Sequence, residues 1–345
     1  MMSDPSSPED LSHELRELVA AGQFREALER AQTGLPNSVR QRPEVQLLAA
    51  TAATRVGELT TAVSLAEAAL EKFRARGDRD GRMRAVNLLG AIAFEHGRLP
   101  EAEPLFGEAL FLARQLGDSL MEARASNNLA SMAVLRGEPD TALTLYRSAL
   151  LSYTRLGDRR GTSEAYHNLG ITFRLIREWH DSQDAAAQAV RHAELLGERS
   201  LMALAVMGRA EIELERGDLE LAERELQRAS ALAHEAGDEL GSAEVMRLQA
   251  VLALAKGDFE SGLRLAEAAL LVAQRFASTL LEGESAAAAA RALRGMGRIA
   301  EAEGRRALAI QRFEALGAVR WVEQLQREWE EGGDKRPRPK RPRKR

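Results

Sequence analysis

The chain has 345 residues, of which 45% are hydrophobic, 29% are charged and only 4% are aromatic. This apolar content is enough to bury a core, and the shortage of aromatic residues favours helices packed through alanine and leucine. Because the sequence contains no cysteine, disulfides and thiolate zinc sites are excluded. No apolar run is long enough to cross a bilayer, and the N-terminal stretch MMSDPSSPED has no signal-peptide pattern. We therefore expect a cytoplasmic protein.

The charge is distributed unevenly between the body of the chain and its C-terminal tail. The tail, residues 332–345, carries eight Lys or Arg residues and one acidic residue. The rest of the chain has 40 basic and 51 acidic residues, so the body carries about −11 and the tail +7. The body by itself is therefore not expected to bind polyanions in bulk.

Taken in chain order, the sequence begins with residues 1–9, which we expect to be disordered, and a short helical hairpin around Gly22. From there a glycine recurs every 40 residues, and one exception, Arg177, stands in the remaining slot. The recurring glycines are Gly57, Gly97, Gly137, Gly217, Gly257 and Gly297. A fixed period of this length indicates a repeat architecture, in which each repeat is one supersecondary unit.

Small residues recur at fixed distances from this glycine. Twelve residues after each slot stand seven alanines, namely Ala69, Ala109, Ala149, Ala189, Ala229, Ala269 and Ala309. Apolar positions with helical spacing lie on both sides of the glycine. Each repeat is therefore predicted to form a first helix (helix A), a turn, and a second helix (helix B), with small residues where helices cross closely. Stacked repeats bury one continuous core, so we predict an all-α solenoid of about eight helical hairpins over residues 10–331.

Three places depart from the repeat. Arg177 and Ser182 replace the expected glycine and alanine of one hairpin, which predicts irregular stacking there. The loops between repeats carry a second recurring glycine, at Gly77, Gly117, Gly157, Gly197, Gly237 and Gly317. The loop near Phe276 lacks this glycine, which predicts that the helices there run on. Residues 319–331 approximately, with two tryptophans at helical spacing, are predicted to form a helix that caps the last repeat, and residues 332–345 a disordered basic tail.

This pattern of a small residue, a turn glycine and a second small residue resembles the tetratricopeptide repeat. The segments NNLASMAVLRG and RLPEAEPLFGEAL resemble the long repeats, of about 40 residues, in kinesin light chains and in sensor domains of bacterial regulators. The resemblance covers residues 11–318 approximately. It implies a right-handed superhelix of helix-turn-helix pairs in which the A helices line the concave surface and bind a protein or an extended peptide.

Signals for catalysis, metals and cofactors are weak. The six histidines never form an i, i+4 pair, so no helical metal site is expected. The stretch GMGRIA, together with Gly295, has the spacing of a dinucleotide-binding loop, but it follows an alanine-rich helix rather than a strand. We therefore predict that the protein is not an enzyme and needs no cofactor.

Asparagine recurs on the A helices, although it is a mediocre helix former. In the repeat register Asn127 aligns with Asn87 and His167, and Asn128 aligns with Asn168. An asparagine side chain both donates and accepts hydrogen bonds, so a row of them can pair with the backbone of an extended peptide. The alternative is that these residues merely keep a solvent-facing helix surface polar.

Arginines one helical turn away favour an acidic partner, because guanidinium groups pair with carboxylates. The predicted peptide-binding residues are Arg84, Asn87, Arg124, Asn127, Asn128, His167, Asn168 and Arg174. The clamp by which some tetratricopeptide repeats grip a terminal carboxylate is not expected, because the matching positions hold Ala91, Ser131 and Ile171.

The sequence thus predicts a non-enzymatic scaffold that binds a protein or peptide, which the arginines suggest is acidic. The alternative is a regulatory protein that couples ligand sensing to nucleic acid through its tail. The segment Lys335–Arg345 is basic enough for weak, non-specific nucleic-acid binding, but it has no aromatic residue to stack on bases. Its prolines rule out a continuous helix, and a merely solubilising tail remains open. The sequence does not predict the oligomeric state.

Overall fold

The structure, a computed structural model, describes residues 8–20 and 22–333. Eighteen α-helices follow one another in this part of the chain, and no β-strand occurs among the described residues. The N-terminal unit consists of α1 (Pro8–Ala20), α2 (Phe24–Glu29), a π-helical turn (Arg30–Gly34) and α3 (Asn37–Arg40). None of the described helices is long and apolar enough to cross a membrane.

Seven helical pairs follow the N-terminal unit, each made of an A helix and a B helix. The A helices are α4 (Pro43–Arg55), α6 (Arg79–Glu95), α8 (Ser119–Arg136), α10 (Arg159–Leu175), α12 (Arg199–Arg216), α14 (Glu239–Ala255) and α16 (Thr279–Gly295). The B helices are α5 (Leu59–Arg76), α7 (Leu99–Leu116), α9 (Pro139–Leu156), α11 (Trp179–Leu196), α13 (Leu219–Glu235), α15 (Phe259–Arg275) and α17 (Ile299–Ala315). The last helix, α18 (Val319–Gly333), has no B helix after it. The all-α solenoid predicted from the repeat is confirmed.

The ends of the solenoid differ slightly from the prediction. Residues 8 and 9 belong to α1, and residues 332 and 333 belong to α18, although both pairs were predicted to be disordered. The remaining residues of the two predicted disordered segments, 1–7 and 334–345, lie outside the described residues. The predicted nucleic-acid-binding segment Lys335–Arg345 is among them.

The alanine column lies where helices cross. All seven alanines of this column have at most 1% of their surface exposed. Close approach is also seen at Gly90, where a methyl group added to the glycine would lie 2.8 Å from the ring of Phe106. The repeat therefore places small residues where the A and B helices cross, and larger apolar side chains fill the space between the crossings.

Local signals begin and end the helices as the sequence predicts. Gly77, Gly117, Gly157 and Gly197 end B helices with a left-handed backbone conformation, which glycine adopts without steric cost. Aspartates that follow such glycines accept hydrogen bonds from the next helix, as Asp78 does from the Gly81 amide at 2.9 Å. Each of these loops therefore contains the residue that ends one helix and the residue that caps the next.

Both predictions made for the irregular repeats are wrong. Arg177 adopts the left-handed conformation of the glycine it replaces, with φ of 63°, and α10 packs on α11 as closely as the other pairs do. Ser182 is buried and donates a hydrogen bond to the Gly170 carbonyl at 2.8 Å. The helices near Phe276 do not run on, because Ala277 takes up the left-handed turn with φ of 50°.

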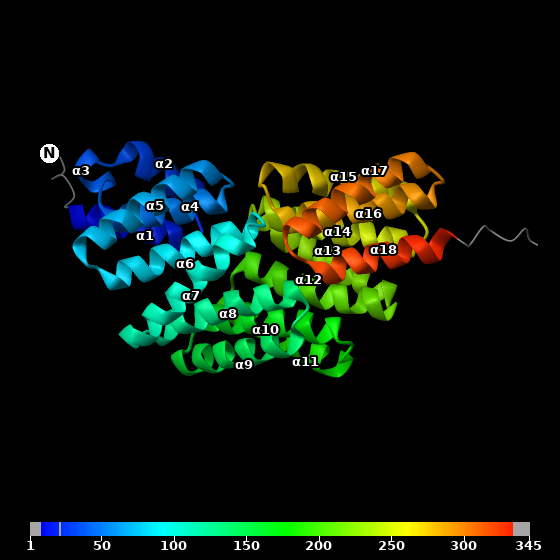
Figure 1. Cartoon of the computed structure of the whole chain (residues 1–345), viewed down its shortest axis with the longest axis horizontal. Helices are drawn as coiled ribbons and strands as arrows, with labels where there is room; N and C mark the ends of the chain where they lie inside the picture. Colours follow the sequence, from blue (N-terminus) through cyan, green and yellow to red (C-terminus); the bar gives the residue numbers. More distant parts are fainter. Residues whose placement is uncertain (1–7, 21, 334–345) are drawn as a thin grey trace, which may run out of the picture.

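The solenoid curves strongly. Figure 1 shows the first repeats on the left, the middle repeats below and the last repeats on the right, with the inner ends of the first and last repeats close together. Successive A helices approach each other more closely than successive B helices do. The A helices therefore lie on the concave side of the superhelix.

Candidate functional site

The candidate site is the concave face, which we define as the surface formed by the polar side chains of α6, α8, α10, α12, α14 and α16. Arg55, at the end of α4, contributes to the electrostatic environment of Glu164 on α10, although the two helices belong to different ends of a four-repeat stretch. Burial raises the pKa of Glu164, while Arg160 and Arg55 lower it. Arg55 and Glu164, from the first and fourth helical pairs, are therefore close enough to interact electrostatically.

The predicted asparagines form a ladder between neighbouring A helices. Asn128 on α8 donates its side-chain amide to Asn87 on α6 at 3.3 Å. Asn168 on α10 donates in the same way to Asn127 on α8, also at 3.3 Å. Each rung joins residues 41 positions apart, one more than the repeat length, because the A helices are slightly offset. We call these four residues the asparagine ladder.

Each side chain of the asparagine ladder has a hydrogen-bonding group that the rungs do not use. All four side chains are only half-buried. Asn87 and Asn127 use their oxygens in the rungs, and within the described residues their amide nitrogens have no partner. For Asn128 and Asn168 the reverse holds, since the nitrogen is used and the oxygen is not. Unused donors and acceptors therefore alternate along the surface, which is the requirement for pairing with an extended backbone.

His167 ends the ladder. The residue that would form the next rung is Gly208, and a methyl group added there would lie 2.6 Å from His167 Nδ1. The imidazole thus lies against the backbone of α12. Burial lowers the pKa of His167 to about 4, although Glu211 opposes the shift. The side chain is therefore neutral at physiological pH, with one nitrogen as donor and one as acceptor.

The predicted arginines have different surroundings. Arg84 and Arg124 are exposed, and Arg84 pairs with Asp80 one turn earlier, at 3.1 Å. Arg124 contacts the sulfur of Met121 at 4.0 Å. Arg174 is instead part of a network of ion pairs, with 14% of its side chain exposed. Only the two exposed arginines are available to an acidic ligand.

A chain of ion pairs crosses the C-terminal half of the concave face. Arg174 on α10 pairs with Glu211 on α12 at 3.2 Å and also with Glu215. Glu211 pairs in turn with Arg247 on α14 at 2.8 Å, and Arg247 pairs with Glu284 on α16 at 3.2 Å. We call these residues the arginine–glutamate chain. It joins four successive A helices.

Of the two arginines in this chain, the sequence analysis named Arg174 and missed Arg247. Arg247 occupies the same repeat position as Asn87, Asn127 and His167. The position that indicated the asparagines therefore also contained the signal for Arg247. Its side chain is 13% exposed, and it is held between two glutamates.

The carboxylates of this region titrate differently. Burial raises the pKa of Glu211, but Arg174 and Arg247 more than compensate and bring it to about 2. Burial raises the pKa of Glu244 to about 7, which Arg247 opposes and Glu284 reinforces. No hydrogen bond or ion pair joins Glu244 to any described residue. Within the described residues, no group of three metal-ligating side chains is close enough to hold a metal ion.

Comparison with known proteins identifies the repeat. Two family models of the tetratricopeptide repeat match, over residues 47–116 and 121–194. No curated protein is significantly similar to the chain in sequence.

Solved structures share the fold at low sequence identity. A Rap protein complexed with competence and sporulation factor is 13% identical, with a TM-score of 0.63, over 95% of this chain and 99% of that one. NprR in complex with its cognate peptide NprX is 10% identical, with a TM-score of 0.62, over 96% and 98%. A signal-transduction ATPase with a tetratricopeptide-repeat sensor, PH0952 from Pyrococcus horikoshii, is 14% identical, with a TM-score of 0.54, over 92% and 48%. The two model matches show that residues 47–116 and 121–194 are tetratricopeptide repeats, and the helical pairs after them continue the same fold.

Proposed function

We propose that the protein is a non-enzymatic scaffold that binds an extended peptide segment along its concave face. The observation that carries this proposal is the asparagine ladder, with its alternating unused donors and acceptors. A purely solvent-facing surface needs polarity but not asparagine, which lowers helix propensity. Arg84 and Arg124, exposed beside the ladder, favour acidic side chains or a terminal carboxylate on the peptide.

Two of the similar solved structures support this proposal, because each is a complex. NprR was solved with its cognate peptide, and the Rap protein with competence and sporulation factor. Both cover nearly the whole of this chain with the same fold. A fold of this kind carries many recognition surfaces, so the residues of the concave face have to define the ligand.

The test is a selection of random peptides displayed on phage, using the intact protein as bait. The variant Asn127→Ala/Asn128→Ala/Asn168→Ala should lose at least about tenfold in affinity for the selected peptides, since each lost hydrogen bond contributes about 0.5–1.5 kcal/mol. Helicity should be retained, because alanine has the higher helix propensity.

A matched control removes three exposed polar side chains from the outer helix α9, in the variant Thr141→Ala/Ser148→Ala/Thr154→Ala. This control should bind the selected peptides as the intact protein does. Equal binding by both variants would show that the asparagine ladder only joins the A helices.

A second candidate function follows from the charge separation between the body and the tail. We propose that residues 334–345 contact nucleic acid without sequence preference, as their excess of basic residues favours. A chain ending at Gly333 should lose most of its affinity for duplex DNA, and the intact chain should lose the same affinity as salt is raised. DNA binding that survives the truncation would refute this role.

A further inference from the structure

The turn glycines of the repeat have two different environments. A methyl group added to Gly217, Gly257 or Gly297 would meet nothing within 4 Å. Added to Gly57 or Gly97, it would lie 2.8 Å from the Phe276 ring or 3.1 Å from Thr279. The turns of the first repeats are therefore covered by residues more than 180 positions further along the chain.

The covering residues belong to the loop 276–279 and to the start of α18. His96 Nδ1 donates a hydrogen bond to the Ala277 carbonyl at 2.7 Å. Arg320 lies 3.0 Å from the methyl position of Gly137, and its Nη2 donates to the Leu175 carbonyl at 3.4 Å. These contacts reach the turns of four successive repeats.

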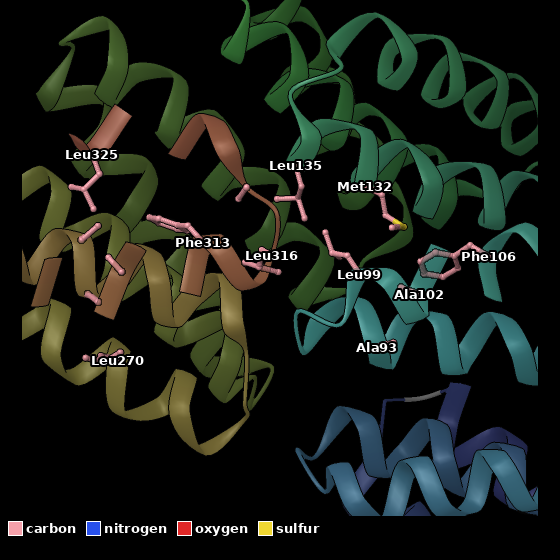
Figure 2. Close-up of a cluster of buried hydrophobic side chains, with 14 residues drawn as sticks. Ala93, Leu99, Ala102, Phe106, Met132, Leu135, Leu270, Phe313, Leu316 and Leu325 are labelled. Carbon is pink, nitrogen blue, oxygen red and sulfur yellow. The ribbon is translucent and has the colours of Figure 1, made fainter. Parts of the chain in front are cut away.

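A buried apolar cluster supports the same contact. Leu99 and Leu135, from α7 and α8, belong to one core cluster with Phe313, Leu316 and Leu325 from the last two helices and the loop between them. Figure 2 shows Leu316 lying between Phe313 and Leu99, with Leu135 beside it. Leu99, Leu135 and Leu316 have at most 8% of their surface exposed. The contact between the two ends is therefore a packed interface.

The irregular loop of the repeat now has a physical explanation. Its missing glycine is replaced by Ala277, which holds φ of 50°. A non-glycine residue in this conformation is strained, because its Cβ lies too close to the following carbonyl oxygen. The preceding residue, Phe276, supplies the ring that covers Gly57, and Ala277 supplies the carbonyl for His96. This loop departs from the repeat at the point where it contacts the other end of the molecule.

We propose that the loop 276–279 and the start of α18 form a clasp that closes the superhelix around the concave face. A bulky partner then reaches this face only when the clasp opens, whereas a small molecule reaches it in the closed state. The clasp rests on the observed contacts, and its role in binding rests on the proposed function of the concave face. The two are tested separately, because the experiments below use no peptide.

The first experiment compares two triple variants that place the same strain on the backbone. Gly57→Ala/Gly97→Ala/Gly137→Ala adds methyl groups under the clasp, and Gly217→Ala/Gly257→Ala/Gly297→Ala adds them in open space. The matched positions have nearly the same backbone, with φ of 81° at Gly57 and 80° at Gly257. Any difference between the variants therefore comes from the clasp.

Because the natural chain has no cysteine, Glu58→Cys and Gln274→Cys provide two unique and exposed spin-label positions beside the clasp. The variant with methyl groups under the clasp should show a longer and broader label distance and a larger radius of gyration than its control. Identical distances in both variants would overturn the clasp. If the first variant does not fold, Phe276→Ala/Arg320→Ala removes the contacts without adding bulk and takes its place.

The second experiment measures access to the concave face. Arg124→Cys places a single exposed thiol one helical turn from Asn127. A small maleimide should label it at the same rate with the clasp intact or disrupted. A maleimide carrying a long polyethylene glycol chain should react at least about tenfold faster once the clasp is disrupted, which corresponds to a closed state favoured by about 1.4 kcal/mol. Equal rates for the large reagent would overturn the gating role.

Discussion

The two halves of the concave face join their A helices in different ways. In the N-terminal half, neutral amides pair between α6, α8 and α10 at 3.3 Å and leave half of their hydrogen-bonding groups unused. In the C-terminal half, Arg174, Glu211 and Arg247 pair between α10, α12 and α14, with at most 16% of each side chain exposed. The same fold can therefore present an adaptable polar surface and a fixed ionic one.

The amide pairs and the ion pairs are expected to contribute differently to ligand binding and to stability. An amide rung contributes little free energy and can exchange its partner for a ligand. A largely buried ion pair is costly to break, because the remaining partner keeps its charge without compensation. We therefore expect ligand binding to depend on the asparagine ladder and the relative position of the helices to depend on the arginine–glutamate chain.

The largest effect should come from Glu211→Ala, since this carboxylate pairs with both Arg174 and Arg247. Leaving two largely buried arginines without their shared partner should lower the free energy of unfolding by about 3–5 kcal/mol. Urea denaturation followed by circular dichroism measures it. Glu215→Ala, at a side chain 45% exposed, is the control and should cost about 0–1 kcal/mol. Similar losses for both variants would mean that the arginine–glutamate chain is not a fixed network.

The alanine column should respond alike in both halves. Ala149 and Ala229 are buried at the same repeat position, in the N-terminal and C-terminal halves. Ala149→Leu and Ala229→Leu should each lower the free energy of unfolding by about 1–3 kcal/mol, because the added side chain overpacks a helix crossing. An unchanged melting temperature in only one variant would show that the halves differ in their cores as well.

Glu244→Gln tests whether the carboxyl group of Glu244 makes the stability of the protein depend on pH. Because the pKa of Glu244 is raised from 4.5 to about 7, the folded state binds more protons than the unfolded state between these values. This carboxyl group therefore costs the natural protein stability as the pH rises through that window. The variant should match the natural protein at about pH 4.5 and exceed it by about 1–3 kcal/mol above pH 7.

Thermal melts over this pH range measure the difference between Glu244→Gln and the natural protein. Glu260→Gln, at an exposed position on α15, serves as the control and should give the same small effect at all these pH values. A difference for Glu244→Gln that does not change with pH would contradict the shifted titration.

The smallest effect should come from Asn87→Ala. The lost rung costs about 0.5–1.5 kcal/mol, and the gain in helix propensity returns roughly 0.5 kcal/mol. The matched variant in the other half is Arg247→Ala, at the same repeat position. It leaves Glu284 without its arginine and Glu211 with Arg174 alone. Chemical denaturation should therefore show a clear loss for Arg247→Ala and almost none for Asn87→Ala. Equal losses would remove the distinction between the two halves.

The candidate site was only partly predictable. The repeat register brought Asn87, Asn127 and Asn168 to attention, because residues 40 or 41 positions apart lie on neighbouring A helices. It did not show that these side chains bind each other, since that depends on the offset between helices. Arg247 stood at the same repeat position and was overlooked because its column contains six different residue types among the seven A helices.

The sequence by itself determined the helices, their crossings and the turns that carry glycine, because these follow from local spacing, from glycine at left-handed turns and from alanine at close contacts. Only the tertiary structure decided the contact of His96 with Ala277, 181 positions away, and of Arg320 with Leu175, 145 positions away. Closure of the superhelix depends on a small rotation at each repeat, added over seven helical pairs. Since no single repeat determines the total rotation, no local pattern could reveal where the two ends of the molecule meet.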